Sequence, residues 1–193
     1  MPDTELTGDL FLVSHETNVR FTAPAAKPEA LLVDRIRAGE VEAFDELYRM
    51  FAPMIHGIVL SRVPREDADD VTQEVFIAAY KNLNSLRDAS AVGPWLAKIA
   101  RNFSAGLFRG RRQEDELTDE ISEERRPENE ASEILDMILR MPVAYKETLV
   151  LRLVEGMTGP EIAEQTGMTP DSVRVNLHRG MKLLRKGLGI EVL

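Results

Sequence analysis

The residues of this 193-residue chain best suited to bind a ligand lie near its C-terminal end, in the stretch TPDSVRVNLHRGMKLLRK from Thr169 to Lys186. Projected as a helix, the stretch divides into two faces. The apolar side consists of Val173, Leu177, Gly180 and Leu184. The opposite side is mainly polar and cationic and carries Ser172, Val175, Arg179, Lys182 and Lys186, with Asp171 and His178 beside them. Such a helix can pack on its own lobe and present hydrogen-bond donors to base edges in a DNA major groove.

We therefore predict a DNA-reading helix. Its candidate contacts are Asp171, Ser172, Arg174, Val175, Asn176, His178, Arg179, Lys182 and Lys186. Lys182 and Lys186, toward the C-terminal end, are better placed for phosphate than for bases. Taken alone, the pattern also fits a surface helix whose solvent face is basic.

The residues just upstream favour the DNA-binding interpretation, because TGPEIAEQTGMTPDS has the chemistry of a helix-turn-helix. Gly167 can adopt the left-handed conformation that ends a first helix. Thr169 can cap the second helix, and Pro170 suits its first turn. Small Ala163 lets the two helices approach closely.

Catalytic chemistry finds little support elsewhere in the chain. The acids of PREDADD, residues 64–70, could serve a helical metallohydrolase, but no HExxH motif, glycine-rich phosphate loop or nucleophile motif accompanies them. Cysteine is absent and the three histidines are scattered. We expect no metal, no cofactor and no enzymatic activity.

The charge is distributed unevenly. The formal net charge is -9 and the isoelectric point is about 5.0. Between Gln113 and Glu133 every charged residue except Arg125 and Arg126 is acidic, and this segment lacks apolar periodicity. We predict a flexible acidic linker over residues 113–130.

The remaining pattern predicts an all-α protein with two small helical domains joined by this linker. Residues 1–28 read as a flexible extension, 29–112 as the first domain and 131–190 as the second. Pro53 should kink or divide the helical pattern VEAFDELYRMFAPMIHGIVLSRV. No apolar run approaches the roughly 20 residues of a membrane span, and the acidic N-terminus lacks a basic signal-peptide start. We expect a cytoplasmic protein without membrane insertion.

Three segments occur in order: DADDVTQEVFIAAYKNL, then WLAKIARN followed by a basic run, then LVEGMTGPEIAEQTGMTPDSVRVNLHRGMKLLRK. Together they resemble a bacterial RNA polymerase sigma factor of the extracytoplasmic-function type, in the sigma-70 family. The resemblance covers residues 30–188. It implies a sigma region 2 bundle, a region 4 helix-turn-helix, and as partners core RNA polymerase, promoter DNA and an anti-sigma factor.

The resemblance also implies roles for residues of the first domain. In DDVTQEVF, the contacts to the clamp helices of the beta-prime subunit correspond to Asp70, Gln73, Glu74 and Phe76. For the minus-ten element, the loop supplies Asn82, Asn84, Ser85, Arg87 and Asp88. The helix that follows, from residue 95 to residue 112, supplies Lys98, Arg101, Asn102 and Arg109. Region 4 would read the minus-thirty-five element.

Some positions depart from the family pattern, among them Gly106, Val175 and Asn176, and most clearly one short segment. Where that helix usually reads FRAWL, this chain has VGPWL, with Gly93 and Pro94 in place of a cation and a good helix former. Trp95 falls on the apolar stripe with Ile99, so we expect it to pack in the core.

A rival interpretation stays open. A helix-turn-helix regulator acting at operators, without being a polymerase subunit, explains the C-terminal pattern equally well. It does not explain DDVTQEVF followed by a basic helix.

Overall fold

The computed structural model describes residues 27–115 and 129–190, with side chains described for all of these except 108–115. The predicted extension 1–28 and linker 113–130 lie almost entirely outside the described residues. Within them all regular structure is helical, as predicted. The α-helices are α1 (Pro28–Arg37), α2 (Val41–Leu60), α3 (Ala68–Asn82), α4 (Val92–Asp115), α5 (Glu130–Leu139), α6 (Val143–Leu153), α7 (Gly159–Thr166) and α8 (Pro170–Gly187).

Helices α1 to α4 form the first lobe, in which α2 packs against each of the other three. On α2 the apolar residues at helical spacing, Leu47, Phe51, Ile55 and Ile58, are buried. Of the two effects predicted for Pro53, a kink or a division of the helix, the division is wrong, because α2 runs unbroken through it. Phe51 and Ile55, on either side of Pro53, enter the same core, so packing holds the two halves together.

Helix α4 begins earlier and ends later than predicted. The side chain of Asp88 accepts a hydrogen bond from the backbone N–H of Ser90 and starts a short 3₁₀ turn, Ala89–Ala91, that leads directly into Val92. At the other end, α4 extends to Asp115, beyond the predicted domain boundary. Leu107, in the second half of α4, is 41% exposed.

Helices α5 to α8 form the second lobe, and the predicted helix-turn-helix is confirmed. Gly167 ends α7 in the left-handed conformation, with φ of 73°. Thr169 caps α8 by accepting a hydrogen bond from the backbone N–H of Ser172. A capping box between Thr158 and Glu161 fixes the start of α7.

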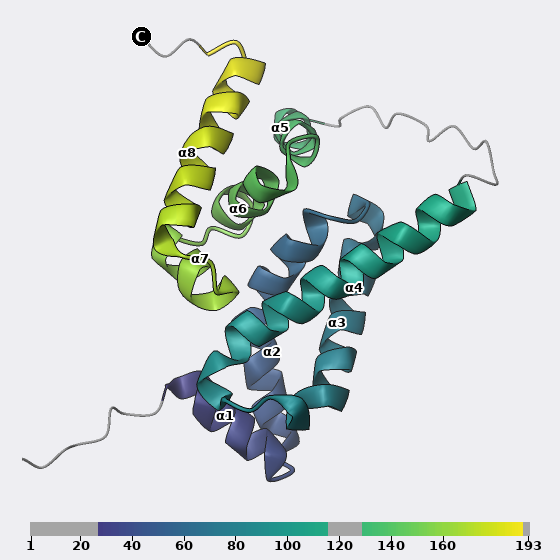
Figure 1. The fold of residues 1–193 in the computed structure, drawn as a ribbon, viewed down its shortest axis with the longest axis vertical. Helices are drawn as coiled ribbons and strands as arrows, with labels where there is room; N and C mark the ends of the chain where they lie inside the picture. Colours follow the sequence, from purple (N-terminus) through teal and green to yellow (C-terminus); the bar gives the residue numbers. More distant parts are fainter. Residues whose placement is uncertain (1–26, 116–128, 191–193) are drawn as a thin grey trace, which may run out of the picture.

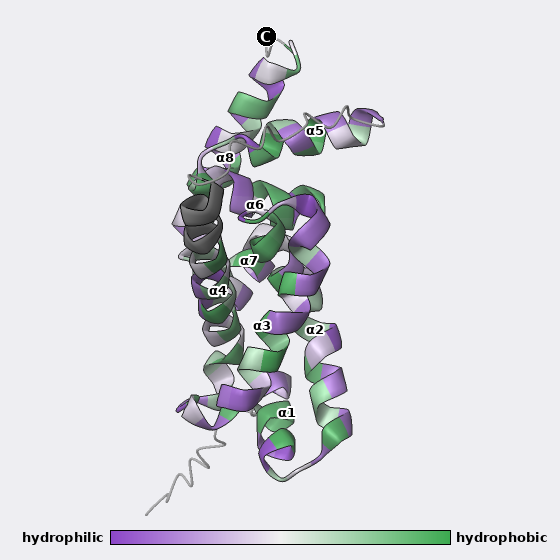
Figure 2. Ribbon diagram, turned by 90° about the vertical axis from the view of Figure 1, so that its right-hand side faces the viewer, coloured by the Kyte–Doolittle hydropathy of each residue, from purple (hydrophilic) through white to green (hydrophobic). Residues whose placement is uncertain are grey.

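The two lobes pack directly against each other. Helices α6 and α7 lie against α2 and α4, and the lobes are stacked along the long axis, with α1 at one end and α5 and α8 toward the other (Figures 1 and 2). Gly57 permits the approach on α2: a Cβ there would lie 2.8 Å from Cδ2 of Leu151 and 2.9 Å from Cγ of Glu155. The sequence pattern of two lobes on a linker did not predict this closed arrangement.

In the described parts of the chain, no helix has the length and apolar character needed to cross a membrane. The same residues contain no cluster of three or more histidine, aspartate or glutamate side chains that could hold a metal ion.

Candidate nucleic-acid and polymerase interfaces

The proposed DNA-reading face of α8 is open to solvent. Val173, Gly180 and Leu184 are buried against the lobe, and Leu177 is partly buried. Asn176 is partly buried as well, and the other candidate contacts are exposed, namely Asp171, Ser172, Arg174, Val175, His178, Arg179, Lys182 and Lys186. The division of faces predicted from the sequence is therefore present. A groove in a nucleic acid could receive this side of α8 without moving the helix on its lobe.

Two residues of this face neutralise each other in part. Nη2 of Arg174 lies 3.2 Å from Oδ1 of Asp171, one turn earlier on the helix. Both side chains are largely exposed, so water screens the pair and it stabilises the protein little. Arg179 and the two lysines have no such acidic neighbour among the described ion pairs, which leaves the cationic end of α8 available to an anion.

The predicted polymerase contacts on α3 lie in two different environments. Asp70, Gln73 and Glu74 are exposed on one side of the helix, beside Ile77, which is 44% exposed. Phe76, in contrast, is only 3% exposed and packs edge-on to Phe44. The structure thus offers three polar contacts and an apolar neighbour to a partner, while Phe76 supports this face from within the core.

The predicted minus-ten loop is exposed at each candidate position, Asn82, Asn84, Ser85, Arg87 and Asp88. Two of these side chains already serve the local fold. Asn82 donates a hydrogen bond of 2.8 Å to the carbonyl of Ala78. Asp88 accepts hydrogen bonds from the hydroxyl and the backbone N–H of Ser90, and these bonds lower the pKa of its carboxyl. Asn84, Ser85 and Arg87 therefore remain the stronger candidates for contacts to the minus-ten element.

On α4, Lys98 and Asn102 are exposed, and Trp95 packs partly buried against the core, as predicted. The side chain of Arg109 lies outside the described residues.

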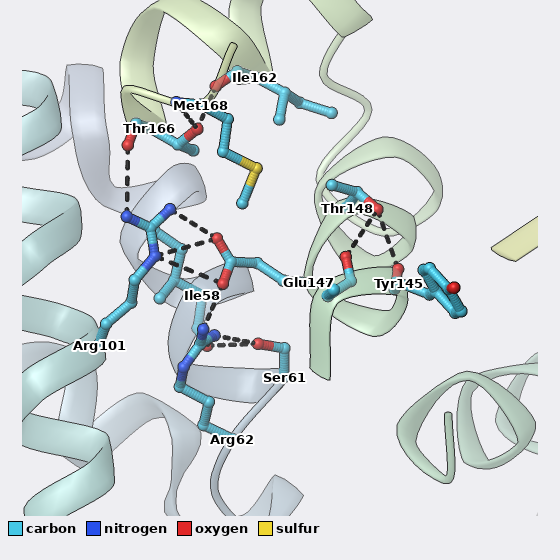
Figure 3. Close-up of polar contacts among 11 residues, drawn as sticks. Ile58, Ser61, Arg62, Arg101, Tyr145, Glu147, Thr148, Ile162, Thr166 and Met168 are labelled. Atoms are coloured by element: carbon cyan, nitrogen blue, oxygen red, sulfur yellow. Dashed lines mark hydrogen bonds and ion pairs between the residues drawn. The ribbon is translucent and has the colours of Figure 1, made fainter. Parts of the chain in front are cut away.

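Arg101 has a partner that the sequence analysis missed. Its Nη2 lies 2.7 Å from Oε1 of Glu147, a residue of α6 in the other lobe, and its Nη1 donates to the carbonyl of Thr166 at 3.3 Å (Figure 3). The same carboxylate pairs with Arg62, which follows the end of α2. Glu147 is 2% exposed, so one buried carboxylate joins two arginines of the first lobe.

A signal for this contact is present in the sequence. Glu147 lies one turn before the fully buried Leu151 on α6, and therefore on the side of the helix that faces inward. A charged residue at such a position needs a partner of opposite charge. The pattern does not say which cations supply it.

Three further polar contacts connect the lobes. Nδ1 of His56 lies 2.7 Å from Oε1 of Glu155. Two exposed contacts accompany it: Lys27 pairs with Glu164 at 2.6 Å, and Arg65 donates to the hydroxyl of Ser132 at 3.3 Å. Screening by water weakens the Lys27 pair, whose side chains are both about half exposed. The buried Glu147 cluster and the His56 contact are therefore the specific polar links.

Each lobe matches a known protein family. Residues 47–114 match the family described as Sigma-70 region 2, and residues 131–184 match Sigma-70, region 4. The chain is 31% identical over 172 residues to the ECF RNA polymerase sigma-E factor of Haemophilus influenzae, covering 79% of this chain and 91% of that protein. It is 32% identical over 178 residues to the RNA polymerase sigma-H factor of Pseudomonas aeruginosa, covering 81% and 92%.

Solved structures share the fold. CnrH, in complex with the cytosolic domain of CnrY, matches with a TM-score of 0.58 at 22% identity, covering 85% of this chain and 99% of that chain. The sigma factor RpoE of Bartonella quintana, in complex with the anti-sigma factor NepR, matches with a TM-score of 0.56 at 18% identity, covering 79% and 100%.

Proposed function

Because the chain belongs to the extracytoplasmic-function sigma factors of the sigma-70 family, we propose that it binds core RNA polymerase and directs promoter-specific initiation, with each lobe reading one promoter element. The observation that carries the proposal is the order of the two matched regions in one chain, the second ending in the exposed, cationic face of α8. An operator-binding regulator would need only the second region.

We propose the following contacts with the polymerase and with each promoter element. The polar face of Asp70, Gln73 and Glu74 meets the clamp helices of the beta-prime subunit, with Ile77 adding apolar contact. The loop after α3 and the exposed side of α4 meet the minus-ten strand. The solvent face of α8 enters the major groove of the minus-thirty-five element, where cationic and amide side chains read base edges.

The chain itself carries out no chemistry under this proposal. The polymerase makes and breaks the bonds, and the sigma factor contributes binding energy that positions the promoter and favours strand opening. The proposal places the protein in the cytoplasm, where its polymerase and promoters are. An anti-sigma factor is a further expected partner. One structure of the same fold was solved in complex with the anti-sigma factor NepR, and another in complex with the cytosolic domain of CnrY.

The test is run-off transcription with purified core polymerase over a library of promoter fragments. Supporting the proposal requires transcripts from a defined subset of promoters that depend on both the chain and the core enzyme. A chain that binds duplex DNA selectively but neither associates with core polymerase nor starts transcripts would instead be an operator-binding regulator.

A further inference from the structure

Two arginines of the first lobe, Arg62 and Arg101, contact the same carboxylate, that of Glu147. We propose that Arg62 and Arg101 form a binding site for a backbone phosphate of DNA, and that Glu147 occupies this site as an internal ligand while the lobes are packed. This inference rests on the proposed function, because it takes promoter DNA as the ligand that replaces Glu147. It adds Arg62 to the nucleic-acid interface and makes lobe packing a competitor of DNA.

The geometry of the cluster suits a phosphate as well as a carboxylate. Arg101 places Nη2 and Nε 2.7 Å and 3.2 Å from Oε1 of Glu147, while Nη2 of Arg62 pairs with Oε2 (Figure 3). Two oxygens of one anion are therefore held by two guanidinium groups. The planar guanidinium binds two oxygens of a carboxylate or of a phosphate in the same bidentate manner.

The first lobe positions Arg62 without help from Glu147. Its Nη1 donates to the carbonyl of Ile58 at 3.2 Å and to the hydroxyl of Ser61 at 2.7 Å. That hydroxyl is buried and itself donates to the Ile58 carbonyl. All of these partners belong to α2 and its end, so the guanidinium keeps its place when the second lobe moves away.

Separation of the lobes leaves the two arginines in need of a new anion. Glu147 is 2% exposed in the closed form, and both arginines that pair with its carboxylate belong to the first lobe, so separation of the lobes breaks both pairs. Arg62 and Arg101 then lose the carboxylate that both of them contact, and the repulsion between two like charges held near each other is no longer offset. Exposed Lys98 lies one turn before Arg101 on α4, so a strand following this helix would pass both cations in succession.

Two glycines at the interface, Gly93 and Gly167, allow the lobes to approach closely. A Cβ on Gly93 would lie 2.9 Å from the backbone oxygen of Gln165, and one on Gly167 would lie 3.0 Å from Cβ of Pro94. Gly93 and Pro94 are the residues that depart from the family pattern FRAWL. The departure thus falls where α4 contacts the second lobe, next to the helix that carries Arg101.

Lobe packing and DNA binding at this site must therefore oppose each other. Both use the same two guanidinium groups, so each weakens the other by the same factor. The free protein in its closed form withholds part of its minus-ten surface from stray nucleic acid. Any partner that draws the second lobe away exposes it.

The first experiment removes the internal ligand. Glu147→Gln is made in the full chain, and affinity for a fluorescent polythymidine strand is measured by anisotropy in the absence of polymerase. Because the chain has no cysteine, dyes on Glu42→Cys and Glu133→Cys report lobe separation by energy transfer. We expect lower transfer and about fivefold or greater gain in affinity, within the usual range for coupled sites.

The second experiment tests Arg62 directly. Gly57→Ala should open the lobes, because the atoms nearest to its new Cβ belong to Leu151 and Glu155 of the second lobe, and the substitution changes neither arginine nor Glu147. In that background Arg62→Gln should weaken strand binding and reduce the salt slope by about 0.7, as expected for one lost single-strand phosphate contact. Arg49→Gln, an exposed arginine elsewhere on α2, is the matched control and should leave the slope unchanged.

Three results would overturn the proposal. Arg62→Gln could leave affinity and salt slope unchanged in the open background. Glu147→Gln could separate the lobes without raising affinity. Polyglutamate could displace the strand as well as unlabelled polythymidine does, which would assign the site to an acidic protein segment. Should the Gly57→Ala protein not fold, Arg62→Gln is placed in the Glu147→Gln background. Failure of the proposed function would show separately, as absence of core-dependent transcription by the wild-type chain.

Discussion

Nδ1 of His56 on α2 lies 2.7 Å from Oε1 of Glu155, just beyond the end of α6, so a titratable hydrogen bond crosses between the lobes. Nε2 of the same ring lies 3.6 Å from Oδ1 of Asp69 on α3. The hydrogen bond with Glu155, more than the charges of the two acids, raises the pKa of His56 although partial burial acts against it. The raised pKa means that the closed protein binds this proton more tightly than an open one.

We predict that lobe packing weakens as the pH rises. In the open form His56 loses Glu155, and its pKa falls back toward the ordinary value of about 6.5. The stabilisation of the closed form is therefore complete below that value and is lost as the pH rises through the raised pKa. Energy transfer between lobe-specific dyes should be constant below about pH 6.5 and fall as the pH rises above it.

The control for this prediction is His56→Gln, which keeps a polar side chain but removes the titration. Its energy transfer should vary little over the same range. An identical pH profile in wild type and variant would assign the dependence to another group.

The parts of the fold that follow from local rules were predictable from the sequence. The left-handed turn at Gly167, the cap at Thr169 and the buried side of α8 each depend on residues within a few positions of one another. The helical spacing of Val71, Val75 and Ala79 likewise matches the buried side of α3. Such features depend only on the chemistry of residues close in sequence, so they can be predicted from one sequence.

The closed arrangement was not predictable in this way. The pairing of Arg101 with Glu147 joins residues 46 positions apart, and a pattern of charges does not specify which cation meets which acid. Arg101 was therefore predicted only as a DNA contact, although in the structure it also joins the two lobes. The continuity of α2 through Pro53 was missed for a similar reason, because tertiary packing overrode a local helix-breaking rule.

We predict that Gly180→Ala destabilises the second lobe. A Cβ at this position on α8 would lie 2.9 Å from Cδ1 and 3.0 Å from Cγ of Leu149, whose side chain is fully buried. Overpacking of this kind should outweigh the better helix propensity of alanine, with a net loss of about 1–2 kcal/mol in urea denaturation.

Gly106→Ala on α4 is the matched control. A Cβ there meets nothing within 4 Å. The substitution should therefore stabilise the protein by up to about 1 kcal/mol, through helix propensity alone. If both substitutions changed the free energy of unfolding equally, the side chain of Leu149 would have moved aside without loss of stability.

We predict that Glu74→Lys weakens binding to core polymerase without unfolding the chain. Glu74 is exposed on the side of α3 that also carries Asp70, so reversing its charge removes no packing. Facing cations on a partner helix would be repelled. Affinity for core enzyme is measured by titration of a labelled chain, and helicity by circular dichroism. Asp45→Lys, an exposed acid on α2, should leave affinity nearly unchanged, and equal losses in both variants would indicate only a general charge effect.

The last prediction separates base reading from phosphate binding on α8. Arg179 and Lys186 are both exposed on the cationic side of this helix, but Arg179 lies nearer its start, the end that enters the groove in helix-turn-helix proteins. Arg179→Ala should cost about 1–3 kcal/mol at a selected minus-thirty-five element and relax the preference at one position. Lys186→Ala should weaken binding to all duplexes alike and reduce the salt slope by about 1. Both are measured on a panel of duplexes with single substitutions, over a range of salt concentrations. If Arg179→Ala lowers every affinity by the same factor, Arg179 contacts phosphate, and sequence selection belongs to other residues of this face.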